Sequence, residues 1–499
     1  MKKILFVGFY EPREHIQCIK ELFEKNNFIV DNYPLFQYSR DTKCKIANIK
    51  DHLNDHINQT CPDIILWFFL DVSIDTFVYI KEKHPTLFYI MYNSDDPVNF
   101  SMDLLEKIKI FDVLVTPCCE YINKYKLYSG IKTVLHIPSS YDPTFYYKIN
   151  NPRDVDSKIV NKYTCDISIF CLNLLENNSR YPNQYINRKQ MINEIIEYAK
   201  KNNKIFKIYG PQFIEEIYKD NYGGTVGYQE LVYLFNFSKI NISTHIDYTK
   251  STCFVDHDFK ILGSGGLLFI DPIKDIEKTL NNRVNCVIIN KNNYISQLDG
   301  ILKNYSVYDK VKKNGQTVGK QYVYANWVNK VVIEIGRHYF SPDFYSKMYK
   351  ISDKNNAELF NYWVGKGITE KHIPYSFDIP KNFDIKKYID ETKFKHDNPQ
   401  NIYLDWIKNG KNTKFIMNIK PIELTKSINN INNIIGTNTF KIPNTELFNV
   451  MYAFNKIANP YDTDKGLNKL QKISIQNPNL QINELVDAYI KLTNNQIIK

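Results

Sequence analysis

Residues 4–8 read Ile-Leu-Phe-Val-Gly, a short run that is apolar throughout and ends in glycine. Residues 15–25 follow, with isoleucine, leucine and phenylalanine at the three- and four-residue spacing of a helix. The apolar run predicts a buried strand, and the spacing after it predicts an amphipathic helix. A strand without polar residues is covered on both faces, which is typical of a parallel sheet between helices.

The same pattern recurs along the first 300 residues in two series of apolar runs with helical stretches between them. The first series is 4–8, 63–70, 87–92, 113–117 and 133–138, and the second is 166–170, 204–210, 240–244, 266–271 and 286–290. Each series predicts one α/β unit around a parallel sheet. We therefore expect an α/β fold of two facing Rossmann-like domains, joined in the polar stretch at 150–165.

A repeat of 43 residues marks a mostly helical region behind the two series. Its members are Phe340, Tyr345, Trp363 and Gly367, which recur as Phe383, Tyr388, Trp406 and Gly410. A fixed period of this kind predicts two tandem helical modules, which we interpret as a scaffold that docks a protein partner. The predicted domains are residues 1–155, 156–339, the repeats at 340–414 and a helical tail at 415–499.

The charge of the chain is modest for its length and is spread along it. The 64 basic and 54 acidic residues give a net charge of +10, and the lysines are scattered. Nucleic-acid binders cluster their basic residues to neutralise adjacent phosphates, so no nucleic-acid partner is expected. The positive balance either favours an anionic substrate such as a nucleotide sugar or is a solvated surface.

Two further features concern where the protein works. No stretch approaches the roughly 20 apolar residues of a membrane span, so no span is predicted. The nine cysteines form no Cys-x-x-Cys pair, which is typical of a reducing compartment. We expect a cytoplasmic protein. The Asn-, Lys- and Ile-rich composition suggests an AT-rich genome, such as that of a giant virus. In that case we expect the protein in the host cytoplasm or in the virion.

The segment with the most distinctive chemistry leads into the run at 266–271. Residues 257–266 read His-Asp-Phe-Lys-Ile-Leu-Gly-Ser-Gly-Gly, a short predicted helix that ends in three glycines. Glycines allow the backbone to approach a phosphate or a sugar, and His257 and Lys260 bring positive charge for a diphosphate. The alternative is a helix C-cap in which glycine leads into the next strand.

This segment resembles the donor-site signature of group 1 glycosyltransferases, particularly those similar to the spore maturation protein CgeB. Further motifs of residues 1–339 follow that family's order: NSDDPVNF (93–100), FDVLVTP (111–117), HIPSSYDPTFY (136–146), Asp166, Arg188, KIYGP (207–211) and VGYQELVYLFNFSKINIST (226–244). The resemblance implies a GT-B fold and a metal-independent transferase without a cofactor. It also implies an acceptor domain at 1–155 and a nucleotide-sugar donor domain at 156–339.

Two positions of the segment depart from the family pattern. Lys260 stands where the family has a Glu that accepts hydrogen bonds from donor hydroxyls, and His257 stands where it has an Arg. A lysine cannot accept a hydrogen bond. Either the donor is held differently, or the protein has lost transfer activity and serves as a binding or scaffold module.

Asp95 and Asp96 are the predicted catalytic residues. They follow the run at 87–92, and the carboxyl ends of parallel strands are where such sheets bind ligands. A carboxylate there can take the proton of an acceptor hydroxyl. The alternative is an Asx turn closed by Pro97.

The predicted donor-binding residues are Arg188, Gly210, Gly227, Tyr228, His257, Lys260, Gly265 and Gly266. Gly227 and Tyr228 open a helix whose first amides can meet a phosphate or base, and Arg188 can pair with a diphosphate. An exposed helical arginine is the alternative for Arg188. His-Ile-Asp at 245–247 and Asp-His-Asp at 256–258 contain metal-ligand residue types, but they lack a second anchoring pair, so no metal is predicted.

The sequence therefore predicts transfer of a sugar from a nucleotide-diphosphate donor to a hydroxyl of an unidentified glycan, protein or lipid. A helix at 321–336 is placed to cross between the domains. An open, cation-lined cleft beneath Gly265 would favour the enzyme, and a cleft filled by Phe or Tyr side chains would favour the binding module. An epimerase would need a Gly-x-Gly-x-x-Gly loop after residues 4–8, which the chain lacks.

Overall fold

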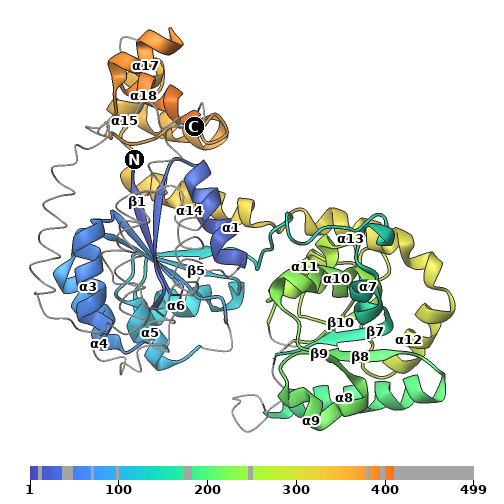
Figure 1. The fold of residues 1–499 in the computed structure, drawn as a ribbon. Helices are drawn as coiled ribbons and strands as arrows, with labels where there is room; N and C mark the ends of the chain where they lie inside the picture. Colours follow the sequence, from blue (N-terminus) through green and yellow to red (C-terminus); the bar gives the residue numbers. More distant parts are fainter. Residues whose placement is uncertain are drawn as a thin grey trace, which may run out of the picture. The chain divides into compact units, whose positions relative to one another are not determined.

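The computed structural model describes residues 1–8, 14–35, 49–68, 72–96, 100–172, 182–245, 251–377, 379, 383–393 and 399–408 (Figure 1). They fall into two compact units. The first runs from Met1 to Ile379 and takes in the start of the last described helix, and the second holds residues 383–393 and 402–408. In the described part of the chain, no helix is long and apolar enough to cross a membrane.

The first unit begins with a six-stranded parallel sheet in the order β2-β1-β3-β4-β5-β6. Its strands are β1 (Lys3–Val7), β2 (Ile29–Tyr33), β3 (Ile64–Trp67), β4 (Phe88–Tyr92), β5 (Val113–Thr116) and β6 (Thr133–His136). The helices between them are α1 (Glu14–Lys25), α3 (Ile49–Thr60), α4 (Ile74–Lys83), α5 (Met102–Ile108) and α6 (Ile122–Ser129). Five of these strands match the predicted runs, and β2 is an additional edge strand.

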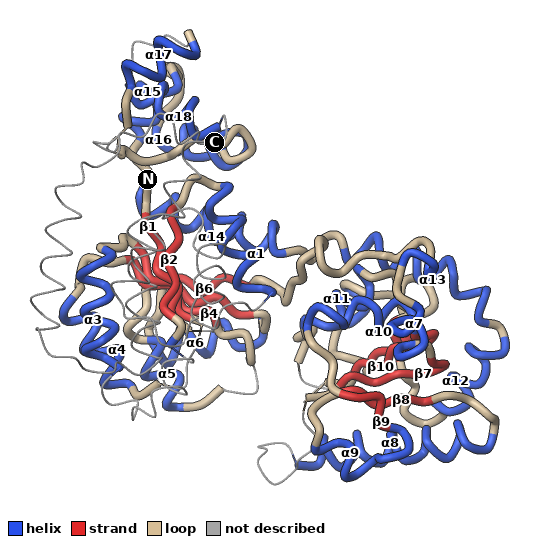
Figure 2. Tube along the Cα trace, in the orientation of Figure 1, coloured by secondary structure: helices blue, strands red, loops and turns tan. Residues whose placement is uncertain are grey.

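Strand β1 shows why the apolar run folds as it does. Ile4 and Phe6 belong to a buried cluster with α1, whereas Leu5 and Val7 belong to a second cluster with α3, α4 and α5. Successive side chains of a strand point to opposite faces, so a run without polar residues is stable only where helices cover both faces. Figure 2 shows helices on either side of the strands.

The second sheet has the same build, in the order β12-β11-β10-β7-β8-β9, and all its pairs are parallel. Its strands are β7 (Cys165–Phe170), β8 (Phe206–Tyr209), β9 (Tyr222–Gly224), β10 (Ser238–Ser243), β11 (Leu268–Ile270) and β12 (Val287–Ile288). Its helices are α7 (Ser157–Tyr163), α8 (Pro182–Lys201), α9 (Phe213–Tyr218), α10 (Leu231–Phe237), α11 (Asp256–Gly263), α12 (Tyr294–Lys303) and α13 (Asp309–Gly319). The predicted fold class, two Rossmann-like domains followed by a helical region, is confirmed.

Helix α14 (Tyr324–Tyr339) leaves the second series and packs on the first sheet. Its Trp327 and Val331 are fully buried in the cluster that contains Ile4 and Phe6, and the Trp327 ring contacts Tyr92 of β4 edge-on. Helices α15 (Pro342–Tyr349) and α16 (Asn356–Tyr362) follow, and a π-helical turn at Trp363–Gly367 extends α16. These elements continue the core of the first sheet.

The aromatic arrangement of the first repeat recurs in the second. In the first, the ring centroids of Phe340 and Tyr345 lie 5.5 Å apart at 45°, and in the second those of Phe383 and Tyr388 lie 5.8 Å apart at 48°. The second repeat lies on α17 (Ile385–Thr392) and α18 (Pro399–Lys408). The 43-residue period is thus a period of packing. Gly410 and the predicted tail at 415–499 lie outside the described residues.

Candidate functional site

A cleft of about 320 Å³ opens at the carboxyl ends of the strands. It is lined by Asp96, Phe170, Cys171, Leu172, Arg188, Tyr228, Leu231, Thr244, His245, Cys253, Val255, Asp256, His257 and Lys260. These residues come from the turn after β4, the ends of β7 and β10, helix α8, the 3-10 helix at Tyr228–Glu230 with the start of α10, and the first turns of α11 with the segment before it. Ligands of open parallel sheets bind at this edge, because no helix covers it.

Lys260 lies in the wall of the cleft, and its position is strongly defined. Its side chain is only 1% exposed, and its Nζ lies 2.9 Å from Oδ2 of Asp256, one turn earlier on α11. The ammonium also lies over the rings of Tyr146 and Tyr228, 4.9 and 5.1 Å from their centroids. Aromatic faces and a carboxylate both stabilise a cation, so the charge of Lys260 is maintained despite its burial.

Asp256 supplies the carboxylate of the cleft wall and is half-exposed. Desolvation would raise the pKa of Asp256, but Lys260 and His257 outweigh it and hold the pKa well below its usual range. The His257 Nδ1 lies 3.6 Å from Oδ1 of Asp256, and its ring meets Phe170 edge-on. Asp256 is therefore ionised and can accept hydrogen bonds, which Lys260, one turn later on α11, cannot do.

Asp96 differs sharply from its neighbour Asp95. Asp95 is exposed in the turn after β4 and does not line the cleft, whereas Asp96 is 3% exposed and does. Oδ2 of Asp96 accepts a hydrogen bond from the Thr116 hydroxyl at 2.5 Å, and within the described residues Oδ1 has no partner. Burial raises the pKa of Asp96 to about 6, against the opposing effect of its hydroxyl donors. A carboxylate with this pKa is a competent general base near neutral pH.

Arg188 and Tyr228 complete the polar wall. Arg188 lies on α8, and its Nη2 donates to the Thr244 carbonyl at 3.3 Å while its guanidinium lies over the Tyr185 ring. Tyr228 begins a short 3-10 helix (Tyr228–Glu230) and presents its ring to Lys260. Of the predicted site residues, the cleft brings together Asp96, Arg188, Tyr228, His257 and Lys260.

The four predicted glycines lie outside the lining of the cleft. Gly265 and Gly266 donate their N–H groups to the carbonyls of Leu262 and Ile261, so they close the C-terminal end of α11. The cleft meets the other end of this helix. Gly265 adopts φ +72°, as a helix C-cap requires.

Gly210 and Gly227 occupy two different environments. A Cβ on Gly210 would lie 2.1 Å from the Cys171 carbonyl oxygen, so this glycine permits close packing of β8 beside β7. Gly227 precedes Tyr228 and has open space around it, because no atom lies within 4 Å of the place that a Cβ would take.

His245 and Asp258 form a pair that the sequence pattern does not reveal. Both are buried, and His245 Nε2 lies 2.8 Å from Oδ2 of Asp258. The sequence pattern marks both of them only as metal-ligand residue types. Among the described residues, no three His, Cys, Asp or Glu side chains are arranged to hold a metal ion. The available signal was the position of His245 directly after the strand INIST, at the ligand-binding edge of the sheet.

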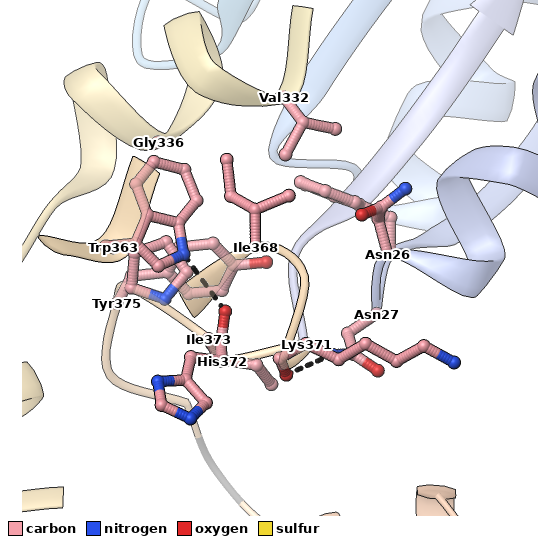
Figure 3. Close-up of a pocket in the computed structure, with 12 residues that line it drawn as sticks. Asn26, Asn27, Val332, Gly336, Trp363, Ile368, Lys371, His372, Ile373 and Tyr375 are labelled. Carbon is pink, nitrogen blue, oxygen red and sulfur yellow. Dashed lines mark hydrogen bonds between the residues drawn. The ribbon is translucent and has the colours of Figure 1, made fainter. Parts of the chain in front are cut away.

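A second, smaller pocket lies between α14 and the loop after the first repeat (Figure 3). Its volume of about 10 Å³ is close to that of a single water probe. Trp363 lies against Gly336 in this view and donates its indole N–H to the His372 carbonyl at 3.1 Å. This pocket is a packing junction and too small for a substrate.

Comparisons with known proteins concern the architecture alone. No family model matches the chain, and no curated protein matches its sequence. Sucrose-phosphate synthase from Thermosynechococcus elongatus is similar with 9% identity and a TM-score of 0.48, over 70% of this chain and all of that one. HepE from Anabaena, in complex with UDP and glucose, has 11% identity and a TM-score of 0.45, over 67% and 99%. A putative UDP-N-acetylglucosamine 2-epimerase from Listeria monocytogenes has 12% identity and a TM-score of 0.47, over 76% and 100%.

Proposed function

We propose that this protein transfers a sugar from a nucleotide-diphosphate donor to an acceptor hydroxyl. The observation that carries the proposal is the composition of the cleft, which combines Arg188, Lys260 and two histidines with a buried carboxylate of raised pKa. Sugar transfer needs both, because a diphosphate leaves as an anion while a hydroxyl must lose its proton.

The donor diphosphate binds to Arg188, His257 and Lys260. These three side chains line one cleft and come from α8 and the first turns of α11. Positive groups that are fixed before the reaction stabilise charge as it develops on the leaving group. Asp256 is ionised and half-exposed beside them. It accepts hydrogen bonds from the hydroxyls of the donor sugar, the role that the resembled family gives to a Glu at position 260.

Asp96 acts as the base toward the acceptor. The acceptor oxygen attacks the anomeric carbon, its proton passes to the Asp96 carboxylate, and the bond from that carbon to the phosphate oxygen breaks with its electron pair on the oxygen. Oδ2 is held by Thr116, so Oδ1 is the oxygen that takes the proton. The acceptor itself, a hydroxyl of a glycan, protein or lipid, is not specified by these contacts.

A second candidate is a nucleotide-binding or scaffold module without transfer activity. The observation in its favour is the close pair of Lys260 and Asp256, which partly neutralises the cation expected to meet the diphosphate. Against it, the cleft is open and contains Arg188 and two histidines besides Lys260, and its aromatic side chains do not fill it. The location differs from the one expected: the cleft lies at the N-terminal end of α11, whereas Gly265 lies at the C-terminal end of that helix.

Calorimetric titration of the full chain with UDP, GDP and their common sugar conjugates tests the donor site. We expect saturable binding that falls at least tenfold in the double variant Arg188→Ala, Lys260→Ala. The control removes the same charge from two exposed positions outside the cleft, Lys278→Ala and Arg283→Ala. If no nucleotide binds the folded wild-type protein, the transferase proposal is wrong.

Transfer itself distinguishes the two candidates. Release of nucleoside diphosphate from the bound sugar conjugate should require Asp96, and Asp96→Asn should bind the donor with unchanged affinity but release no product. Binding without any release, in both the wild type and the variant over a panel of acceptors, would favour the binding module.

A further inference from the structure

His245 is an oriented imidazole with one nitrogen unused. It follows β10, lines the cleft, and has a side chain that is only 3% exposed. Its Nε2 lies 2.8 Å from Oδ2 of Asp258, whereas its Nδ1 has no hydrogen-bond partner among the described residues. Buried polar atoms nearly always have a partner, so a nitrogen without one beside a cleft is a place where a ligand atom is expected.

Asp258 fixes the state of this imidazole. Its Oδ1 accepts from the Ser243 hydroxyl at 2.5 Å, and its Oδ2 also accepts from the Val255 backbone N–H at 2.9 Å. Burial alone would raise the pKa of Asp258, but His245, His257 and the Ser243 hydroxyl outweigh it and keep the pKa below its usual value. An ionised carboxylate can only accept, so the hydrogen on Nε2 belongs to His245.

We propose that His245 binds the sugar-linked phosphate of the donor through Nδ1, as an imidazolium held by Asp258. This inference rests on the proposed function and extends it to one atom of the ligand. His245 would be a catalytic residue because it touches the substrate, and Asp258 would be a positioning residue that acts through it.

The surroundings of His245 favour a phosphate over a neutral group. Arg188 is hydrogen-bonded to the carbonyl of Thr244, the residue before His245, so a guanidinium lies beside this backbone. His257 and Lys260 line the same cleft. Once a phosphate is bound, an ionised carboxylate at Nε2 and an anion at Nδ1 together favour the doubly protonated ring.

The role in the reaction follows from this contact. When the bond between the anomeric carbon and the phosphate oxygen breaks, the electron pair remains on that oxygen and its negative charge increases. The Nδ1–H of His245 donates to the phosphate more strongly as this charge develops, and the proton stays on the ring. The proton of the acceptor hydroxyl passes to Asp96, so the transfer needs no other reactant.

The test compares nucleoside diphosphates with monophosphates on two variants of the full chain. The glutamine amide of the variant His245→Gln reaches about as far as Nε2, so this variant retains the contact with Asp258 and loses the Nδ1 donor. The shorter amide of His245→Asn lies near the Nδ1 position and retains a donor there. Calorimetry with UDP, UMP, GDP and GMP then isolates the contribution of the terminal phosphate.

We expect the wild type to prefer the diphosphate, and His245→Gln to reduce that preference about tenfold to a hundredfold while monophosphate affinity is unchanged. His245→Asn should retain most of the preference, and the control His84→Gln, at a histidine paired with Asn54 and outside the cleft, should retain all of it. If His245 were only structural, His245→Gln would weaken monophosphate and diphosphate binding equally. Loss of a contact to the terminal phosphate weakens diphosphate binding alone.

Three results would overturn the inference, and they differ in what they mean. If His245→Gln weakens monophosphate and diphosphate alike, His245 is structural and the proposed function stands. If His245→Gln changes neither affinity but abolishes product release, the imidazole faces the acceptor. If the wild type binds no nucleotide, the proposed function falls and this inference with it.

Discussion

Lys260 Nζ lies 2.9 Å from Oδ2 of Asp256, so the two charges are paired along one helix at the wall of the cleft. The pair explains how a lysine is tolerated at a buried position in the cleft wall. Its positive charge is retained, and an acceptor is available one turn away. The proposed nucleotide-sugar donor has phosphates that accept hydrogen bonds and hydroxyls that can donate them, so it could use both members of the pair.

Lys260→Met should weaken binding of a nucleoside diphosphate about tenfold, because it removes the ammonium and preserves most of the buried volume. The pKa of Asp256 should rise at the same time, since Lys260 is the main group that lowers it. Calorimetry at pH 7 measures the first effect. Lys278→Met, which breaks an exposed pair with Asp275, is the matched control and should bind normally; equal affinity of all three proteins would contradict the prediction.

Product release should increase as the pH rises through about 6. Asp96 must be ionised to accept a proton, and burial raises its pKa to about 6. The rate at saturating donor should therefore fall about tenfold for each pH unit below that value. A pH–rate profile from pH 4.5 to 8 measures it, and a profile without an acidic limb near pH 6 would exclude Asp96 as the base.

Asp96→Asn should stabilise the fold at pH 8 by about 2 kcal/mol and have little effect at pH 4. The folded pKa of Asp96 is raised above its unfolded value, so the native state binds the proton more tightly and loses this stability as the pH rises from about 4 to 6. Urea denaturation at both pH values checks the sign. Asp353→Asn, at an exposed position outside the cleft, should change neither midpoint.

Gly336→Ala should destabilise the first unit by about 1–3 kcal/mol. A Cβ at this position of α14 would lie 2.0 Å from the Trp363 ring, which is buried and cannot move aside. Gly300→Ala on α12 is the matched control, because nothing lies within 4 Å of its Cβ position and alanine is the better helix former. Thermal denaturation should therefore shift in opposite directions for the two variants.

Much of the fold was predictable because the strands are short apolar runs between amphipathic helices. The runs at 4–8 and 87–92 became β1 and β4, and all of the run at 240–244 except Thr244 lies in β10, which ends at Ser243. Strands β2 and β9 were missed for a physical reason. They are edge strands, β2 has Ile29 exposed and β9 has only three half-buried residues, so neither carries a continuous apolar signal.

The sequence by itself determined the two parallel sheets, the 43-residue aromatic period and the strand ends at which polar residues gather. Only the tertiary structure distinguished Asp96 from Asp95, because neighbouring side chains of a turn point in different directions and only that of Asp96 is buried. It alone joined His245 to Asp258 across the segment between β10 and α11, and paired Lys260 with Asp256 in the cleft. Periodicity reports which face of an element is covered, whereas a site depends on where separate elements end in space.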